Sequence, residues 1–259
     1  MKKRLLSLLL TASLLLSMLP ASVLAAREGL TVVIDNVHVV QENRAVGAMP
    51  AGVDYNESTK TLTLENAALG MMRISGGSLT IVLQGDSTIH NDGRYVDVTG
   101  KPAPAIATGD RNERTSVTIT GPGSLTLDSS GSGARRTFVA DHTDLTITDG
   151  ADVTVRSGDA VGGVAEMVAS RLILNDGASL TGKELFVSEG GTFLLDGATL
   201  DMSGADYALH LWEGGQATFL SGTAALRGTS ATLVPVRCEP DGVLALLGVT
   251  IHLEKPGAN

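Results

Sequence analysis

The sequence predicts an all-β fold, a parallel β-helix solenoid with an N-terminal capping segment, and three observations lead to this prediction. Short strands of alternating apolar and polar side chains fill most of the chain, and patterns of helical period are almost absent. Glycine is abundant, at 31 of 259 residues, while aromatic residues make up 3%. The strand pattern also repeats, in units too short to bury a core alone, so the units are expected to stack.

The repeated motif is an apolar-x-apolar strand, a corner that contains glycine, and a second short apolar strand. Its clearest copies are SLTIVLQGDSTI from Ser78, SVTITGPGSLTL from Ser116, DLTITDGADVTV from Asp144 and RLILNDGASLTG from Arg171, with weaker copies from Thr192, Thr218 and Leu244. Successive corners lie 36, 29, 27, 20, 25 and 26 residues apart. The corner glycines are Gly85, Gly121, Gly150, Gly177, Gly197, Gly222 and Gly248.

A further short strand, mostly apolar and with an acid near its end, lies between successive corners. Its copies are Ala105–Asp110, Phe138–His142, Gly163–Met167, Leu185–Glu189, Ala208–Glu213 and Val234–Glu239. Each unit therefore holds about three strands, as one turn of a parallel β-helix does, and equivalent strands pair at about 4.8 Å. An antiparallel sandwich is the competing architecture. Asn-Gly hairpin signals are scarce, however, and the similarity recurs once per unit rather than once per hairpin.

The first 25 residues have the order of a secretory signal peptide. Met1-Lys2-Lys3-Arg4 is basic, residues 5–19 form an apolar run, and Val23-Leu24-Ala25 is a small-residue cleavage site. The run is shorter than the roughly 20 residues that span a membrane, so we expect export, cleavage after Ala25 and no membrane span afterwards. Residues 26–60 are predicted to form a strand and cap segment, residues 61–254 the β-helix, and residues 255–259 a polar tail in which Pro256 stops strand pairing.

Charge and cysteine content narrow the classes of partner. The formal net charge is -9, and removing Lys2, Lys3 and Arg4 with the signal peptide makes it -12. An acidic chain argues against nucleic acid, which needs a basic surface. It is compatible with cations, basic partners or neutral glycans. The single cysteine, Cys238, excludes an intramolecular disulfide and is interpreted as a small buried apolar residue rather than a reactive thiol.

Two phrases, YNESTKTLTLENA from Tyr55 and SLTIVLQGDSTI from Ser78, resemble those of secreted bacterial right-handed parallel β-helix repeat proteins. The resemblance spans most of Val53–Leu253 and rests on corners and apolar ladders rather than on a catalytic motif. Some members of that family are carbohydrate-binding-domain proteins, and one branch binds acidic polysaccharides with the help of calcium. The wider, pectate-lyase-like superfamily also contains polysaccharide lyases, so the resemblance alone leaves an enzyme open.

The acids that close the third strand of each unit recur with gaps of 31, 25, 23, 24 and 26 residues. If the units stack in register, these carboxylates form a line whose neighbours repel each other, and a bound Ca²⁺ would relieve the repulsion. The alternative is that each acid lies in a solvated turn and points away from its neighbours. The GGxGxD motif of calcium-binding β-rolls does not occur. The six candidate metal ligands are Asp110, Asp141, Glu166, Glu189, Glu213 and Glu239.

Tyr207–Glu213 contains the only tryptophan of the chain. Because side chains alternate along a strand, His210 and Trp212 share one face while two leucines share the other, which predicts that Trp212 points outward. An exposed ring beside hydrogen-bonding groups suits the apolar face and polar edge of a sugar. The alternative is that Trp212 packs under a loop. The candidate carbohydrate-binding residues are His210, Trp212, Glu213 and Arg237.

These observations predict a secreted or envelope-associated module that binds extracellular polysaccharide or cell-envelope glycan. They favour a non-catalytic role over an enzymatic one. One alternative is a polysaccharide lyase or glycoside hydrolase acting on the same face, with Arg237 as the base of an elimination. A hydrolase would need two carboxylates about 5–9.5 Å apart, which a line of acids always supplies, so the pattern does not discriminate. A second alternative is a structural or adhesive spacer.

Overall fold

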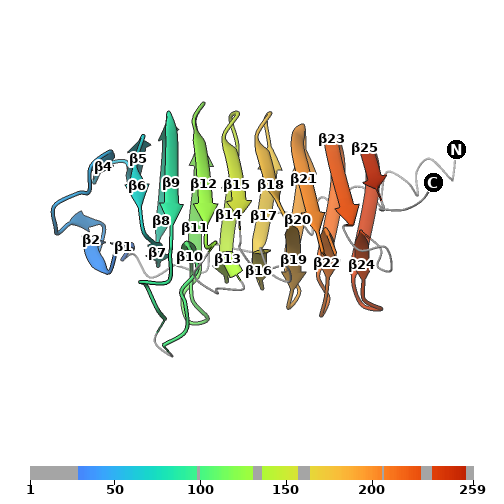
Figure 1. The fold of residues 1–259 in the computed structure, drawn as a ribbon, viewed down its shortest axis with the longest axis horizontal. Helices are drawn as coiled ribbons and strands as arrows, with labels where there is room; N and C mark the ends of the chain where they lie inside the picture. The colour runs from blue at the N-terminus through green and yellow to red at the C-terminus, as the bar shows by residue number, and fades with distance from the viewer. Residues whose placement is uncertain are drawn as a thin grey trace, which may run out of the picture.

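A computed structural model describes residues 29–97, 100–130, 136–156, 164–205, 207–228 and 235–254. These residues form 25 β-strands and no helix, so no helix that could cross a membrane occurs among them. The strands stack side by side along the long axis of the molecule, from β1 to β3 at one end to β25 at the other (Figure 1). The predicted signal peptide and tail lie outside the described residues.

The segment before residue 61 pairs antiparallel. The strands are β1 (Thr31–Ile34), β2 (Val37–Gln41), β3 (Arg44–Ala45) and β4 (Val53–Asn56). Strand β1 lies between β2 and β7, β2 pairs with β3, and β4 pairs with β5. Within the described residues, the strands from β5 onward pair with one another in parallel.

The parallel strands form three rows. Row 1 contains β7 (Met72–Ser75), β10 (Ile106–Thr108), β13 (Arg136–Asp141), β16 (Val164–Val168), β19 (Glu184–Ser188), β22 (Leu209–Leu211) and β24 (Val236–Cys238). Row 2 contains β5 (Thr61–Glu65), β8 (Ser78–Gln84), β11 (Thr115–Thr120), β14 (Thr143–Ile147), β17 (Arg171–Asn175) and β20 (Thr192–Asp196). Row 3 contains β6 (Ala68–Leu69), β9 (Asp86–His90), β12 (Ser124–Asp128), β15 (Asp152–Arg156), β18 (Ser179–Gly182) and β21 (Ala198–Gly204).

Two long strands continue both row 2 and row 3. Strand β23 (Gln216–Gly228) pairs with β20 through its first half and with β21 through its second half, and thereby joins the two rows into one sheet. Strand β25 (Val243–Glu254) pairs with β23 along its whole length. The fold is thus all-β with parallel strands arranged in sheets, as predicted, and the antiparallel sandwich is excluded.

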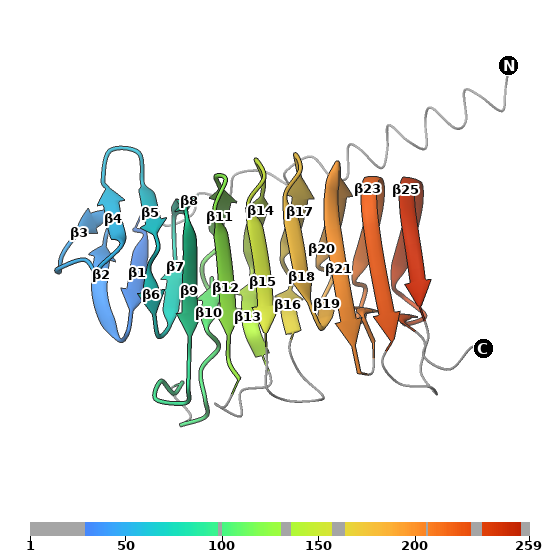
Figure 2. The same cartoon turned by 45° about the horizontal axis from the view of Figure 1, so that its top comes forward.

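The predicted corners lie between row 2 and row 3. Gly85 separates β8 from β9 and Gly150 lies between β14 and β15, both in the left-handed region, with φ of 79° and 76°. A left-handed residue between two strands turns the chain from one row to the next, and glycine adopts it without strain. The chain returns from row 3 to row 1 through connections of very different length. Lys183 alone lies between β18 and β19, whereas the long connection after β9 projects from the stack (Figure 2).

A single apolar core receives side chains from all three rows. Burial alternates along the strands, as in β17, where Leu172 and Leu174 are buried and their neighbours are half-buried. The register keeps core positions in line, so that Leu172 is paired with Leu145 on one side and Phe193 on the other. The expected burial of Cys238 is wrong. It continues the column of the fully buried Leu211 but is exposed, because β24 is the last described strand of row 1.

Candidate functional site

The predicted face around Trp212 lies on the outside of row 1 near the C-terminal end. Leu209 and Leu211 of β22 are fully buried, so His210 and the following Trp212 point away from the core. Backbone hydrogen bonds fix the position of Trp212. Its N–H donates to the Val187 carbonyl at 3.0 Å, and its carbonyl accepts the Gly215 N–H at 3.0 Å. Trp212 is 44% exposed. The alternation therefore places the tryptophan as expected.

Trp212 belongs to a group of four rings, which we call the aromatic patch: Phe186, Tyr207, His210 and Trp212. The Phe186 ring lies 5.8 Å from that of Trp212 and 4.9 Å from that of His210, centroid to centroid, and the second contact is edge to face. The Tyr207 and His210 rings are also 4.9 Å apart. Neighbouring rings at these separations attract each other, so the patch is a packed surface rather than four independent side chains.

Arg237 is bound at the edge of the aromatic patch. Its guanidinium donates to the Tyr207 hydroxyl at 2.6 Å, lies 5.1 Å from the centre of the Tyr207 ring and pairs with a Glu239 oxygen at 2.7 Å. The hydrogen bond to Tyr207 raises the pKa of Arg237, and the charge of Glu239 raises it further. A guanidinium in this state keeps its proton, which opposes a role as the base of an elimination.

His210 lies between two carboxylates. Its Nδ1 is 3.6 Å from Glu184 and its Nε2 is 3.8 Å from Glu239, and the side chain is 15% exposed. Nε2 is buried and has no hydrogen bond in the described structure. Glu213, the fourth predicted residue, is exposed in the left-handed turn after Trp212, with φ of 48°. The structure therefore gathers His210, Trp212 and Arg237, with Glu213 beside them in the chain.

The predicted line of six carboxylates is wrong. Glu166 is paired with Val139 and Phe186 in the middle of the row 1 strands, whereas Asp141 is paired with Val168, near the strand ends. The acid recurs once per unit, but at different positions of the unit, so the six carboxylates do not form one line. Glu189 and Glu213 alone among the six share an equivalent left-handed turn, with φ of 51° and 48°.

Four of these acids have basic neighbours instead of a shared cation. Glu166 pairs with Arg136 at 2.8 Å, Asp141 with His142 at 2.7 Å and Glu189 with Arg111 at 3.7 Å, while Glu239 holds Arg237. Asp110 accepts the Asn112 N–H at 2.7 Å. Among the described residues, no group of three or more His, Cys, Asp or Glu side chains is arranged to hold a metal ion. Within the described residues, the six acids therefore do not form the shared site that a Ca²⁺ between them would need.

Glu166 is the most buried of the six, at 5% exposure. Burial raises its pKa; the Arg136 charge opposes this, whereas the charges of Asp141, Glu189 and Glu184 add to it. A perturbed carboxyl is a marker of functional sites. Here the side chain is covered, so it is not available to a ligand in this conformation.

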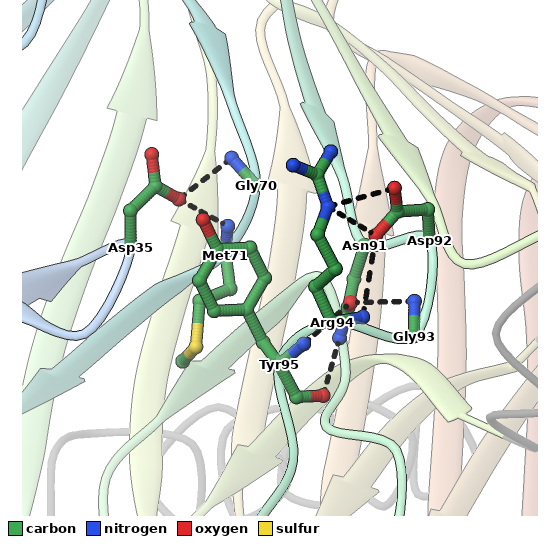
Figure 3. Close-up of polar contacts among 8 residues, drawn as sticks. All are labelled: Asp35, Gly70, Met71, Asn91, Asp92, Gly93, Arg94 and Tyr95. Atoms are coloured by element: carbon green, nitrogen blue, oxygen red, sulfur yellow. Dashed lines mark hydrogen bonds and ion pairs between the residues drawn. The ribbon is translucent and has the colours of Figure 1, made fainter.

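A second polar cluster lies at the N-terminal end, around the connection after β9 (Figure 3). Asn91 is fully buried; its side chain donates to the Tyr95 and Ala103 carbonyls at 3.0 and 2.7 Å and accepts the Gly93 N–H at 2.9 Å. Asn91 thus holds the connection in a fixed path. Arg94, at its surface, pairs with Asp92 at 2.9 Å.

The same connection brings Tyr95 against the N-terminal strands. Asp35, which follows β1, accepts the backbone N–H groups of Gly70 and Met71 at 2.7 and 2.9 Å (Figure 3). A Cβ at Gly70 would overlap the Tyr95 ring. Burial raises the pKa of Tyr95, and the charge of Asp35 raises it further. This cluster fixes the connection after β9, and its polar groups form hydrogen bonds with one another.

Three residues of the Trp212 face were missed by sequence reasoning: Phe186, Tyr207 and Glu184. The signal for Phe186 was available, because aligning Leu185–Glu189 with the next copy, Leu209–Glu213, places Phe186 level with His210, as the structure pairs them. Tyr207 precedes β22 and Glu184 is the first residue of β19, and both fall outside the repeated pattern. Their contacts depend on the three-dimensional path of the chain.

Comparisons with known proteins identify no relative. No protein-family model matches the chain, and neither a curated protein nor a solved structure shows significant similarity to it.

Proposed function

We propose that this protein is a secreted or envelope-associated, non-catalytic module that binds extracellular carbohydrate on the aromatic patch. The observation that carries the proposal is the exposed Trp212 ring, backed by Phe186 and bordered by His210. A flat ring that is held in place offers a sugar its apolar face without a large loss of side-chain freedom. Glu184, Glu239 and Arg237 supply hydrogen-bonding groups at its edge.

The fold part of this proposal is a right-handed parallel β-helix with a cap formed by residues 26–60. Three rows of parallel strands around one core support it, as do the antiparallel strands β1–β4 at the outer edges of β5 and β7. The resemblance to secreted β-helix repeat proteins of the pectate-lyase-like superfamily agrees with this architecture. In such a stack the outer face of row 1 is a continuous surface along which an extended polymer can lie.

Export is the cellular part of the proposal and rests on residues 1–25, which have the order of a cleaved signal peptide. Export would place the aromatic patch where polysaccharides and cell-envelope glycans are found. The acidic net charge of -9 makes nucleic acid an unsuitable ligand.

Binding is favoured over elimination chemistry by the state of Arg237. Its guanidinium is engaged by Tyr207 and Glu239, and its raised pKa opposes proton abstraction. The covered Glu166, similarly, is not presented to a substrate. In this proposal Arg237, with its partners Tyr207 and Glu239, borders the aromatic patch and takes no part in a reaction.

The proposal is tested by glycan binding to the purified protein. Trp212 is the single tryptophan, so its fluorescence reports directly on the patch. Neutral, uronate-rich and amino-sugar polysaccharides are titrated, and Trp212→Ala is compared with the wild type for retention on the insoluble forms. We expect quenching or enhancement with at least one glycan class, and loss of retention in Trp212→Ala with an unchanged circular dichroism spectrum.

The matched control is Val37→Ala, which removes a side chain of similar exposure at the opposite end of the stack. It should bind as the wild type does. Equal retention by the wild type and Trp212→Ala would overturn the proposed site. New reducing ends or unsaturated products absorbing in the ultraviolet would show an enzyme instead.

A further inference from the structure

The C-terminal end of the stack presents free strand edges. Within the described residues, β25 pairs only with β23, and β24 pairs only with β22. One edge of a 12-residue strand therefore has backbone N–H and C=O groups without a described strand partner. Such an edge is a template for pairing with another strand.

The core is also open at this end. Leu246 is paired with the fully buried Phe219, and Leu253 with the buried Leu226, so both leucines occupy core-facing columns. They are nevertheless 51% and 61% exposed. In row 1, Cys238 is likewise exposed although it is paired with the buried Leu211. The last unit thus displays, as surface, the residues that every earlier unit buries.

The opposite end of the stack differs. Strand β4 lies antiparallel on the outer edge of β5, and β1 lies antiparallel on that of β7. Under them, the core residues Leu62 and Ile74 are fully buried. One end of the stack is therefore covered by strands of the chain itself, whereas the other is not covered by any described residue.

The free edge carries little of the charge that protects natural edge strands, apart from Glu254 at its end. From Val243 to Leu253, β25 has no proline and no Asp, Glu, Lys or Arg. The chain as a whole carries 28 acidic against 19 basic residues, so most of its surface repels a second copy. At β25 that repulsion is smallest, and a second copy offers the same uncharged, core-like cross-section.

We propose that two copies of this chain associate end to end through β24 and β25 and so close each other's core. The geometry allows one two-fold axis to serve both strands. An axis that passes through the corner at Gly248 exchanges row 2 with row 3 and pairs β25 antiparallel with its copy, Val243 opposite Glu254. The same axis crosses row 1 in the middle of β24, at Arg237, and pairs β24 antiparallel with its copy.

This arrangement stops at two chains. An isologous contact uses the same surface of both copies, and the far ends of the pair are the ends covered by β1–β4. The two copies of Arg237 come together near the axis without a net like-charge contact, because each is already neutralised by its own Glu239 at 2.7 Å. The proposal is independent of the carbohydrate ligand.

The first measurement is the molar mass of the full chain by light scattering over a range of concentrations. We expect a dimer for the wild type and a shift to monomer in Leu246→Glu and in Leu253→Glu, since each places a charge in the closed core. Val37→Glu introduces the same charge at a residue of similar exposure, 54%, at the covered end, and should stay dimeric. Circular dichroism verifies that each variant is folded.

The second measurement reads the axis itself. In the double variant Arg237→Cys, Cys238→Ser, the two new cysteines lie opposite each other with Cα atoms about 5 Å apart, within disulfide reach. Mild oxidation should link the chains. Val139→Cys, Cys238→Ser carries its thiol on the same outer column, away from the end, and should remain unlinked.

A wild-type monomer at the highest soluble concentration would overturn the proposal and would point to another cover, such as a segment of the same chain. A dimer that persists in both glutamate variants would place the contact elsewhere. Assemblies that keep growing with concentration would exclude a closed two-fold pair.

Discussion

Phe186 and His210 are direct neighbours on β19 and β22, and their rings meet edge to face with centroids 4.9 Å apart. Phe186 also touches the Trp212 ring, at 5.8 Å. It therefore supports His210 of β22 and the following Trp212, although it is itself only half-buried. A residue of the preceding unit thus determines how Trp212 is presented.

Phe186→Leu should weaken glycan binding about two- to tenfold, because one aromatic contact is worth roughly 0.5–1.5 kcal/mol. The measurement is the Trp212 fluorescence titration together with thermal unfolding. The control is Phe193→Leu, which breaks an edge-to-face contact with Phe219, at 5.5 Å, inside the core. It should lower the unfolding temperature and leave affinity unchanged; the reverse pattern would contradict the support role of Phe186.

Glu166→Gln should stabilise the protein at neutral pH. Burial raises the pKa of Glu166 in the folded state, so the ionised form is disfavoured there. The contribution of Glu166 is therefore fully favourable below its unfolded pKa and is lost as the pH rises through its folded pKa. Urea unfolding at acidic and neutral pH should show an advantage of the variant that grows with pH. An advantage that shrinks or reverses as the pH rises would mean that the ion pair with Arg136 dominates instead.

Asp144→Asn should show the opposite sign. Burial alone would raise the pKa of Asp144, but the hydrogen bonds from Arg114, at 2.8 and 3.0 Å, and the charges of Arg114 and Arg171 lower it overall. The stability it adds is present above its unfolded pKa and is lost as the pH falls through its folded pKa. At neutral pH we expect a loss of about 0.2–1 kcal/mol in the free energy of unfolding, reduced by salt. A loss that is insensitive to both pH and salt would contradict this account.

Gly222→Ala should be far more destabilising than Gly150→Ala. Both glycines turn the chain from row 2 to row 3 in the left-handed region, with φ of 104° and 76°. A Cβ at Gly222 would overlap the Ala198 carbonyl oxygen, whereas a Cβ at Gly150 meets nothing within 4 Å. Gly150→Ala should therefore cost about 1 kcal/mol of backbone strain, and Gly222→Ala more, as measured by urea unfolding. Equal losses would mean that the neighbouring strand yields readily.

Asp35→Asn should bring the pKa of Tyr95 back toward its ordinary value. The amide keeps an oxygen for the N–H groups of Gly70 and Met71 but removes the charge that raises the Tyr95 pKa, while the larger effect of burial remains. Ultraviolet titration of tyrosinate measures the change, and Tyr95→Phe identifies which transition belongs to Tyr95. An unchanged transition would show that burial acts alone.

The strands and corners could be predicted because they are local and repeat. Apolar alternation identified β8, β11, β14 and β17, and Gly85 and Gly150 occupy the turns expected of them. Parallel pairing followed from similarity that recurs once per unit. The exposure of Cys238 could not be predicted, because it depends on whether another strand follows it in space rather than on its own sequence context.

The candidate site divides in the same way. The outward direction of Trp212 followed from alternation, whereas the supposed line of carboxylates failed because the repeat fixes the acid once per unit without fixing its position within the strand. Glu166 lies in the middle of β16, whereas Asp141 is the last residue of β13. Register decides between these, and only three-dimensional pairing shows it.

The parallel register of row 1 places equivalent outward side chains in a single column along its outer face. One central outward side chain is contributed by each strand, at a step of about 4.8 Å. A substitution in this column changes one outward side chain while the core below it is unaffected. The connections between strands accommodate differences in unit length. If the proposed function holds, specificity for an extended ligand can be altered one exposed position at a time. From the N-terminal to the C-terminal end of row 1, the residues of this column are Arg73, Ala107, Val139, Glu166, Phe186, His210 and Arg237.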